Sequence, residues 1–360
     1  MTPTAGNPDD ASLVLSQLIA TGCNPYEVKT PYKNDGVDAA MRTRVYGFVK
    51  ANQARIFDAG SLAEVGVCHS SPSRDYVGPT EGNGMYVNAT PPAGIKDWWS
   101  GGEPAMSCAT MPYLGEFRGT VKALVYAHIP FDAITSPGLV AADLARFKVV
   151  LLPNLQAVSD AEAAVLRGYV AAGGTIVITG PAPTALDELG ARRGEFALSD
   201  VLGLKKADPL PASRQNAYGA GTCWYLRALP GLGYLRNTDQ ASADQLLTPV
   251  RRTAPPAVTL AGDRRIFLEA RRLGSDTVVH LVNFTNFGET PAAFRTTPAN
   301  CTLSYALPAG ATVTAVTVAI VATPDGTDPA PKPVPYTVIG ATVSVPLTVV
   351  QYSVVTVSVR

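Results

Sequence analysis

The histidines and cysteines of this 360-residue chain are the side chains best suited to metal binding or nucleophilic chemistry, and their spacing opposes both. Sequence signatures of zinc sites place two ligands within a few positions of each other. The cysteines form no close pairs, no histidine has a neighbour at the spacing of metal ligands, and an odd number of cysteines opposes a complete disulfide framework. We therefore predict structural histidines, reduced and mostly buried thiols, no metal site and no cofactor. The residues concerned are His69, His128, His280, Cys23, Cys68, Cys108, Cys223 and Cys301.

Two adjacent tryptophans are the strongest candidates for carbohydrate contact. Trp98 and Trp99 lie in the segment 97–102, within the Gly- and Pro-rich stretch 77–112. An indole ring offers a flat apolar face to the C–H groups of a sugar, but it packs equally well against a neighbouring subunit or domain. A loop of this length in a compact domain is typically functional or disordered. The sequence leaves both uses of the tryptophans open.

The charge balance excludes two classes of partner. The chain has 29 basic and 29 acidic side chains and a formal net charge of zero, so no long-range field attracts nucleic acid or an anionic membrane. No run of about 18 apolar residues predicts a transmembrane helix, and residues 1–12 lack the charged-then-apolar pattern of a signal peptide. We expect a cytoplasmic protein with no nucleic-acid or membrane partner; a natural start upstream of residue 1 would leave a signal peptide open.

Residues 147–180 have the pattern of a complete strand–helix–strand unit. An apolar run, 149–152, is stopped by Pro153, and Ser159 with Glu162 three residues later forms a capping box at a helix start. The helix is expected to end at Gly173-Gly174, where a left-handed cap costs least, and the β-branched run 175–179 follows at once. Two buried strands joined by a helix normally lie parallel with a right-handed crossover. The pattern predicts a doubly wound α/β domain.

The C-terminal third reads as antiparallel β-structure, because the apolar period changes to two from Val258 onward. Residues 266, 268 and 270 alternate with 267, 269 and 271, and the threonines that alternate along these strands are expected on the solvent face. Pro and Gly separate the predicted strands, as is typical of a β-sandwich. The strands are expected at 266–271, 277–283, 312–321, 336–338, 341–345 and 352–357.

The first sixty residues predict a helix at 11–21, a strand within 23–28 and a longer helix at 38–57. One strand between two helices has no sheet partner and cannot cover the apolar faces of those helices. The segment must therefore dock on another part of the protein. A layer on the α/β domain is one possible position.

The strand–helix–strand unit resembles the class I glutamine amidotransferase-like folds. In that family a cysteine nucleophile stands on a tight elbow after a strand. This chain has Gly180, Pro181, Ala182 and Pro183 after the run that ends at Thr179, and no Cys–His pairing is apparent nearby. The resemblance therefore implies the scaffold without that chemistry. His128 and Asp132 are expected to shape the turn before a neighbouring strand.

Segments 114–134, 147–154, 157–180 and 192–203 resemble, in order and spacing, the β-galactosidase trimerisation domain of glycoside hydrolase family 42. In that family the domain follows a (β/α)₈ barrel and precedes a small β-sandwich. The resemblance implies an α/β plus β fold: a doubly wound, parallel, flavodoxin-like sheet with an N-terminal helical barrel remnant and a C-terminal antiparallel β-sandwich. The implied domains are 1–62 (the last helix, strand and helix of the barrel), 63–254 (trimerisation-like) and 255–360 (sandwich).

This resemblance has a consequence for catalysis. Retaining glycosidases need two carboxyl groups about 5 Å apart, and in the family these come from barrel strands that this chain lacks. We transfer no catalytic residue. Asn24 and Tyr26 would lie at the carboxyl end of the last barrel strand, where barrel enzymes build their sites, and they join Trp98 and Trp99 as candidate sugar-binding residues. An ordinary Asn-Pro turn is the other interpretation of residues 24–27.

Two hypotheses of different classes follow. In the first, the chain is the non-catalytic C-terminal portion of a family 42-like glycoside hydrolase; it supports the active site, forms a homo-oligomer that is a trimer by resemblance, and relies on a barrel segment or partner chain for the acids. In the second, it is a free-standing binding or assembly module with an amidotransferase-like fold, whose N-terminal helices cover the sheet. Clear turnover of a galactoside by the chain alone would contradict both.

Overall fold

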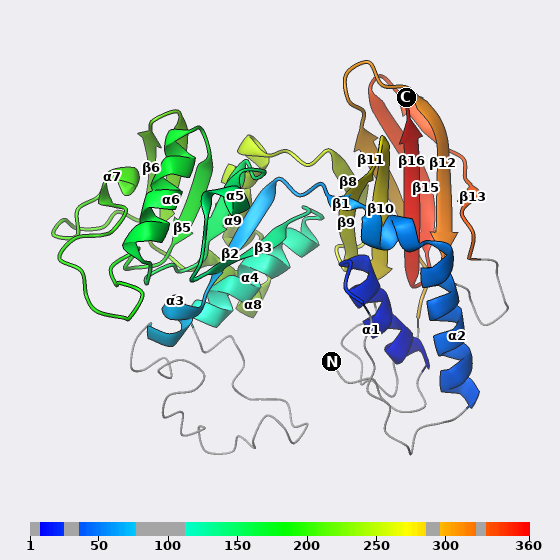
Figure 1. The fold of residues 1–360 in the computed structure, drawn as a ribbon, viewed down its shortest axis with the longest axis horizontal. Helices are drawn as coiled ribbons and strands as arrows, with labels where there is room; N and C mark the ends of the chain where they lie inside the picture. Colours follow the sequence, from blue (N-terminus) through cyan, green and yellow to red (C-terminus); the bar gives the residue numbers. More distant parts are fainter. Residues whose placement is uncertain (1–7, 25–35, 77–111, 286–295, 322–328) are drawn as a thin grey trace. The chain divides into compact units, whose positions relative to one another are not determined.

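The computed structural model describes residues 8–24, 36–76, 112–285, 296–321 and 329–360 (Figure 1). The chain divides into two compact units. The first comprises residues 1–63, 125–130 and 256–360, and the second comprises residues 64–124 and 131–255. None of the helices in the described ranges combines the length and the apolar character that a bilayer span requires.

The second unit is built on a six-stranded sheet in the order β3-β2-β4-β5-β7-β6. The first five strands in that order are parallel, and β6 runs antiparallel to β7. The strands are β2 (Val65–Ser70), β3 (Asp132–Ser136), β4 (Val149–Leu152), β5 (Thr175–Thr179), β6 (Ser213–Tyr218) and β7 (Gly221–Leu226). The helices are α3 (Ser71–Tyr76), α4 (Pro112–Tyr126), α5 (Ala141–Leu144), α6 (Asp160–Ala171), α7 (Ser199–Leu202), α8 (Pro230–Asn237) and α9 (Gln240–Thr253).

Helices cover both faces of this sheet. Alternate residues of a strand point to opposite faces, and Val150 and Leu152 of β4 share a hydrophobic core with Leu166 of α6. Helix α4 reaches the other face, where its Glu116 side chain bonds Thr179 of β5. With the antiparallel sheets of the first unit, the chain has the mixed α/β content, one parallel-rich sheet and antiparallel sheets that the sequence predicted.

The predicted strand–helix–strand unit is confirmed in detail. Strands β4 and β5 have the predicted bounds and pair in parallel. The Ser159 Oγ accepts a hydrogen bond from the Glu162 backbone N–H at 3.2 Å, and the Glu162 carboxylate accepts one from the Ser159 N–H, also at 3.2 Å. After α6, Gly173 takes a φ of +111°, a conformation that glycine adopts at little cost. Local sequence signals alone therefore determine this unit.

The first unit contains two antiparallel sheets, of six strands (β1-β9-β10-β16-β12-β13) and four strands (β14-β15-β11-β8). Their facing sides share one core, in which Val279 and Leu281 of β10 meet Leu303 of β11 and Val345 of β15. The two sheets therefore pack face to face. The strands are β1 (Gly60–Ser61), β8 (Val258–Ala261), β9 (Ile266–Leu273), β10 (Asp276–Asn283), β11 (Ala299–Ala306), β12 (Val313–Ile320), β13 (Lys332–Pro333), β14 (Thr337–Ile339), β15 (Thr342–Val349) and β16 (Tyr352–Val359).

The N-terminal helices pack on the outer face of the six-stranded sheet. Helices α1 (Pro8–Ala20) and α2 (Gly36–Ala51) and the π-helical turn η1 (Ala54–Asp58) share a core with Val278 and Tyr352. The described residues of this core all belong to the first unit. This differs from the hypothesis of a layer on the α/β domain, because the sandwich covers the apolar helix faces. The second helix ends earlier than predicted, and most of the predicted strand at 23–28 lies outside the described residues.

Arg271 of β9 connects these helices to the sheet through hydrogen bonds. Its guanidinium, in a side chain that is only 8% exposed, donates to the carbonyl oxygens of Ala20 at 3.2 Å and Ile56 at 3.0 Å. These carbonyls belong to the last turns of α1 and η1, where helices leave acceptors unpaired and carry partial negative charge. One buried cation thus satisfies the ends of two helices.

Gly22 provides the space that this contact needs, and its replacement tests the contact. Gly22 has a φ of +77°, and a Cβ there would lie 2.5 Å from Arg271 Nη1. We expect Gly22→Ala to lower the free energy of unfolding of the first unit by about 2 kcal/mol, from left-handed strain and displacement of the guanidinium. Urea titration followed by far-UV circular dichroism measures the loss. Gly47→Ala, in α2 with no atom within 4 Å of the added carbon, should be neutral or stabilising; an equal loss in both variants would contradict the account.

Candidate functional site at the carboxyl edge of the parallel sheet

The strand order locates the position where a ligand site is expected in the second unit. From β2 the chain moves to β3 on one side and then to β4 on the other side of β2. Open α/β sheets bind ligands at such a switch point, beyond the carboxyl ends of the strands. The carboxyl edge, meaning the ends of β2, β4 and β5 with the residues that follow them, is therefore the candidate functional site.

The chain's own hydroxyl groups fill the edge between β2 and β4. The Ser73 Oγ accepts hydrogen bonds from the backbone N–H groups of Gln156 at 3.1 Å and Ala157 at 2.9 Å. Ser70 donates from its hydroxyl to Ser73 at 2.9 Å and from its backbone to the Tyr113 hydroxyl. Both serines and Tyr113 are buried. This part of the edge is closed and its polar groups are mutually satisfied.

A second buried polar cluster closes the end of β5. Thr179 donates its hydroxyl to Glu116 Oε1 at 2.8 Å and accepts the backbone N–H of Asn154 at 2.9 Å. Asn154, at a φ of +45°, and Gly180, at a φ of +108°, lie against each other, since a Cβ on Gly180 would overlap the Asn154 side chain. Gly180 stands where an elbow nucleophile would stand in an amidotransferase. At that position the backbone packs against a neighbouring loop and offers no reactive group.

Glu116 is the ionisable member of this cluster, and it was not among the residues predicted from the sequence. Its Oε2 accepts the Leu232 backbone N–H at 2.8 Å, in the first turn of α8. Burial raises the pKa of Glu116 to about 7, although the hydrogen bonds from Leu232, Thr179 and Gly231 act in the opposite direction. The available signal was its position between Gly115 and Gly119, because glycines four residues apart in a helix indicate close packing of another backbone.

Helix α4 holds both ends of α8. Glu116 bonds the N-terminal turn of α8, while Lys122 donates to the Thr238 hydroxyl at 2.6 Å, at the C-cap of α8. A negative group near a helix N-terminus and a positive group near its C-terminus both complement the helix dipole. Glu116 therefore caps the N-terminus of α8 and links α4 to β5 through its hydrogen bond with Thr179.

The two thiols of the parallel sheet, and the histidine near its carboxyl edge, are unsuited to nucleophilic catalysis. Burial raises the pKa values of Cys68 and Cys223 to about 12, so both remain protonated thiols at neutral pH. His69 lies edge-on against the rings of Tyr113 and Phe117, at centroid distances of 5.8 and 5.1 Å, and burial lowers its pKa. Among the described residues, no group of three or more His, Cys, Asp or Glu side chains is arranged to hold a metal ion.

The buried carboxylates do not form a glycosidase pair. Glu116 caps α8, Glu162 caps the helix α6 to which it belongs together with Ser159, and Glu269 lies in the other unit. A retaining mechanism needs two carboxyl groups that face each other about 5 Å apart across the substrate. In the described ranges, each buried carboxylate of the parallel-sheet unit accepts hydrogen bonds from backbone N–H and hydroxyl groups and does not face a second carboxylate.

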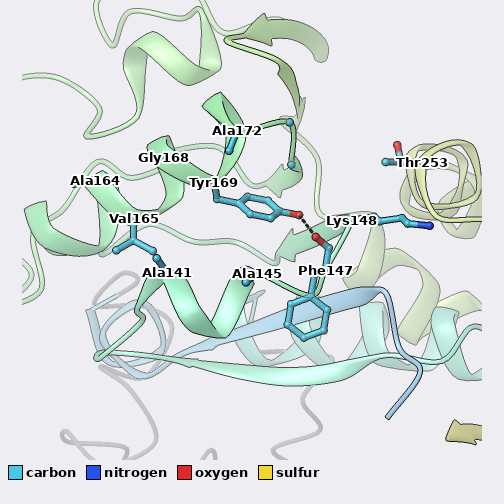
Figure 2. Close-up of a pocket in the computed structure, with 12 residues that line it drawn as sticks. Ala141, Ala145, Phe147, Lys148, Ala164, Val165, Gly168, Tyr169, Ala172 and Thr253 are labelled. Atoms are coloured by element: carbon cyan, nitrogen blue, oxygen red, sulfur yellow. Dashed lines mark hydrogen bonds between the residues drawn. The ribbon is translucent and has the colours of Figure 1, made fainter. Parts of the chain in front are cut away.

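A surface groove of about 850 Å³ lies elsewhere on the second unit, between α5 and α6 (Figure 2). The described residues that line it include no carboxylate. The Tyr169 hydroxyl donates to the Phe147 carbonyl at 3.1 Å, and Lys148 is paired with Glu64 at 2.8 Å. Small and apolar side chains predominate in the rest of the lining, so the groove lacks the convergent polar groups of a catalytic pocket. It is lined by Ala141, Ala145, Phe147, Lys148, Ala164, Val165, Gly168, Tyr169, Ala172, Gly173, Gly174 and Thr253.

Of the predicted sugar-binding residues, the described part of the chain includes Asn24. Asn24 is exposed and follows the end of α1 in the first unit. Tyr26, Trp98 and Trp99 lie outside the described residues. Their role in carbohydrate binding stays a prediction.

The remaining histidines have structural partners in the first unit. His128, at a φ of +53°, places Nδ1 3.1 Å from the Leu260 carbonyl, and burial lowers its pKa. His128 lies in the turn that follows α4, and Asp132 begins β3, where it pairs with Arg146. His280 is fully buried and hydrogen-bonds a tyrosine hydroxyl at 2.7 Å; burial and the nearby Arg271 lower its pKa to about 3.

No protein-family model and no curated protein matches this chain, whereas solved structures do. An α-L-fucosidase isoenzyme 2 from Paenibacillus thiaminolyticus aligns with a TM-score of 0.64 and 15% identity, over 98% of this chain and 58% of the enzyme. Gan42B, a family 42 β-galactosidase from G. stearothermophilus, aligns with a TM-score of 0.60 and 17% identity, over 100% of this chain and 53% of the enzyme.

A β-galactosidase from Bacillus circulans sp. alkalophilus aligns similarly, with a TM-score of 0.60 and 14% identity over 98% of this chain and 52% of the enzyme. The resemblance to family 42 enzymes that the sequence indicated is thus confirmed as a likeness of fold along the whole chain. The chain spans between about half and three fifths of the length of the solved enzymes that it matches.

Proposed function

We propose that this chain is the non-catalytic C-terminal portion of a glycoside hydrolase similar to family 42, and that it supports the active site and assembles the oligomer. The observation that carries the proposal is the likeness of fold along the whole chain to about half of each solved enzyme. The closed carboxyl edge adds support, because its hydroxyls and Glu116 are bonded to each other and to backbone groups.

The finer architecture belongs to this proposal. We infer that residues 1–62 are the last helix, strand and helix of a (β/α)₈ barrel, that residues 63–254 form a doubly wound, flavodoxin-like trimerisation-type domain, and that residues 255–360 form its sandwich. Direct packing of α1 on α2 supports the first assignment, since consecutive helices are neighbours in such a barrel. The acids would come from a barrel segment or partner chain.

The partners follow from the same proposal. They are further copies of the chain, a trimer by resemblance, and a carbohydrate contacted through Asn24, Tyr26, Trp98 and Trp99. No cofactor is proposed, and the cytoplasm remains the expected location. The alternative, a free-standing amidotransferase-like module whose N-terminal helices cover the parallel sheet, has less support because α1 and α2 bury their apolar faces in the sandwich unit.

A glycosidase assay tests the proposal. We expect the purified chain to show no turnover of a chromogenic galactoside or fucoside above a buffer control, because the paired acids are not provided by its described residues. Co-expression with a segment encoding the preceding barrel strands should yield a complex with activity. Turnover by the chain alone, abolished by replacing one of its own carboxylates, would overturn the proposal, and so would a barrel segment that is fully active and stable without this chain.

A further inference from the structure

The terminal strands of the three sheets differ in how well they are protected against pairing with another chain. Unpaired strand edges attract other chains, and proteins protect them by shortness, charge or proline. Among the described residues, the terminal strands β1, β13, β14 and β8 have two, two, three and four residues. Strand β3 has five residues, begins with Asp132 and is followed by Pro137. The sixth, β6, has six residues, no proline and a single charged residue, Arg214.

Within the described ranges, strand β6 has backbone groups on its outer side that no neighbouring strand pairs. A two-residue turn, Gly219-Ala220, joins Tyr218 to its partner Gly221, and the residues that flank such a turn form a hydrogen-bonded pair. Hydrogen-bonded pairs then alternate along the hairpin, and Arg227 N–H bonding to the Ala212 carbonyl at 3.0 Å continues the series. Residues 213, 215 and 217 therefore direct their N–H and C=O groups away from β7.

The edge is also held in a fixed shape. Asn216 donates its side-chain amide to the Asp200 and Val201 carbonyls of α7, at 3.3 and 2.9 Å. The three residues with outward backbone groups, Ser213, Gln215 and Ala217, are all exposed and uncharged. A partner strand thus meets a regular, pre-organised ladder, and binding costs little ordering entropy.

We propose that β6 is a homotypic assembly surface, on which the β6 strand of a second copy pairs antiparallel about a two-fold axis at Gln215. A two-fold operation matches Gln215 with Gln215, and Ser213 with Ala217, so every outward donor meets an acceptor. The inference does not rest on the glycosidase-like role.

The charges on the strand fit the same register. Arg214 is the only charged residue of β6, and the axis at Gln215 places it opposite Asn216 of the second copy and not opposite the second Arg214. Asn216 donates its side-chain amide to the backbone carbonyl of Asp200, and the Asp200 carboxylate is itself ion-paired with Arg167. In this register the two Arg214 side chains are kept apart, and each lies opposite a neutral residue of the other copy. This separation of like charges, with the match of donors to acceptors about the axis, favours a second copy as the occupant.

Proline substitution at the axis tests the pairing. Because the Gln215 N–H points away from β7, Gln215→Pro removes an outward donor without breaking the β6–β7 ladder. One strand pair is a small interface compared with the roughly 1,200 Å² of a stable complex, so we expect two-fold dimerisation through β6 that grows with concentration in the micromolar range, in addition to any trimer formed through other surfaces. Light scattering across a dilution series should show at least tenfold weaker dimerisation for Gln215→Pro, with an unchanged Tm. Gln215→Thr, which keeps the N–H, should behave like the original chain.

Disulfide trapping identifies the register. In a background where Cys23 and Cys108 are replaced by Ser, oxidised Gln215→Cys should form a covalent dimer, because its Cα atoms would be roughly 5.5 Å apart across the axis. Ser213→Cys, on the same strand and face, should not, because its two copies would be roughly 14 Å apart. Equal cross-linking of both variants, or an oligomeric state that Gln215→Pro leaves unchanged, would overturn the proposal. Either result leaves the glycosidase assay unaffected.

Discussion

Replacing Gly119 with alanine should lower the free energy of unfolding of the parallel-sheet unit by about 3 kcal/mol. Helices α4 and α8 pack backbone to backbone at this point. A Cβ on Gly119 would overlap the Gly231 carbonyl, and a Cβ on Gly231 would overlap the Glu116 carbonyl. The obstacle is main chain, which cannot rotate away as a side chain can, so α8 must move and its bond to the Glu116 carboxylate must weaken.

Gly168→Ala is the matched control for this change. Gly168 also lies inside a helix of the same unit, but no atom lies within 4 Å of its added carbon, so alanine should stabilise by about 0.5–1 kcal/mol through helix propensity. Urea titration followed by tryptophan fluorescence measures both, since all three tryptophans lie within residues 64–255. If Gly119→Ala also stabilised the unit, the two helices would not be in backbone contact.

The parts of the fold that the sequence predicted well are those controlled by local signals. The capping box at Ser159 and Glu162, the glycine pair 173–174 and the two β-branched runs fix β4, α6 and β5 almost to the residue, because each signal acts within a few positions of the structure that it determines. Alternation likewise predicted strands β9 and β10 of the sandwich.

The features that the sequence did not predict depend on contacts between distant segments. Residues 269 and 271 alternate with apolar neighbours as if one side of β9 faced solvent, yet both are buried because α1 and η1 cover that side. The expectation that strand threonines face solvent is wrong at Thr277 and Thr356, which are at most 3% exposed. Periodicity shows that a strand has two kinds of face, but not what covers the polar one.

In the candidate site, too, local features were predictable from the sequence and contacts between distant segments were not. The absence of a nucleophile after Thr179 was readable from residues 180–183 alone. The hydrogen bonds that close the carboxyl edge could not be predicted from the sequence, because they join Glu116, Thr179 and Leu232 from three separate segments. A glutamate within a helix ordinarily indicates a solvated face, and its burial here required knowledge of the α4–α8 crossing.

The buried carboxyl of Glu116 should make the parallel-sheet unit less stable as pH rises through neutrality. Burial raises its pKa from an ordinary value of 4.5 to about 7, so between these values the folded state holds a proton that the unfolded state has released. Stability is then fully present below pH 4.5 and falls as pH rises through 7, by about 3 kcal/mol in all. Because the glutamine side chain does not titrate, the Glu116→Gln variant should not lose this part of its stability as pH rises.

The free energy of unfolding of Glu116→Gln, minus that of the original chain, should therefore rise by most of this amount between pH 5 and pH 8. Urea titrations at several pH values measure the difference. Glu188→Gln, which removes an exposed carboxylate of the same unit, corrects for the change in net charge. A constant difference for Glu116→Gln would mean that the donors on Leu232 and Thr179 outweigh burial, so that the carboxylate is already ionised at pH 5 and caps α8 as a full negative charge.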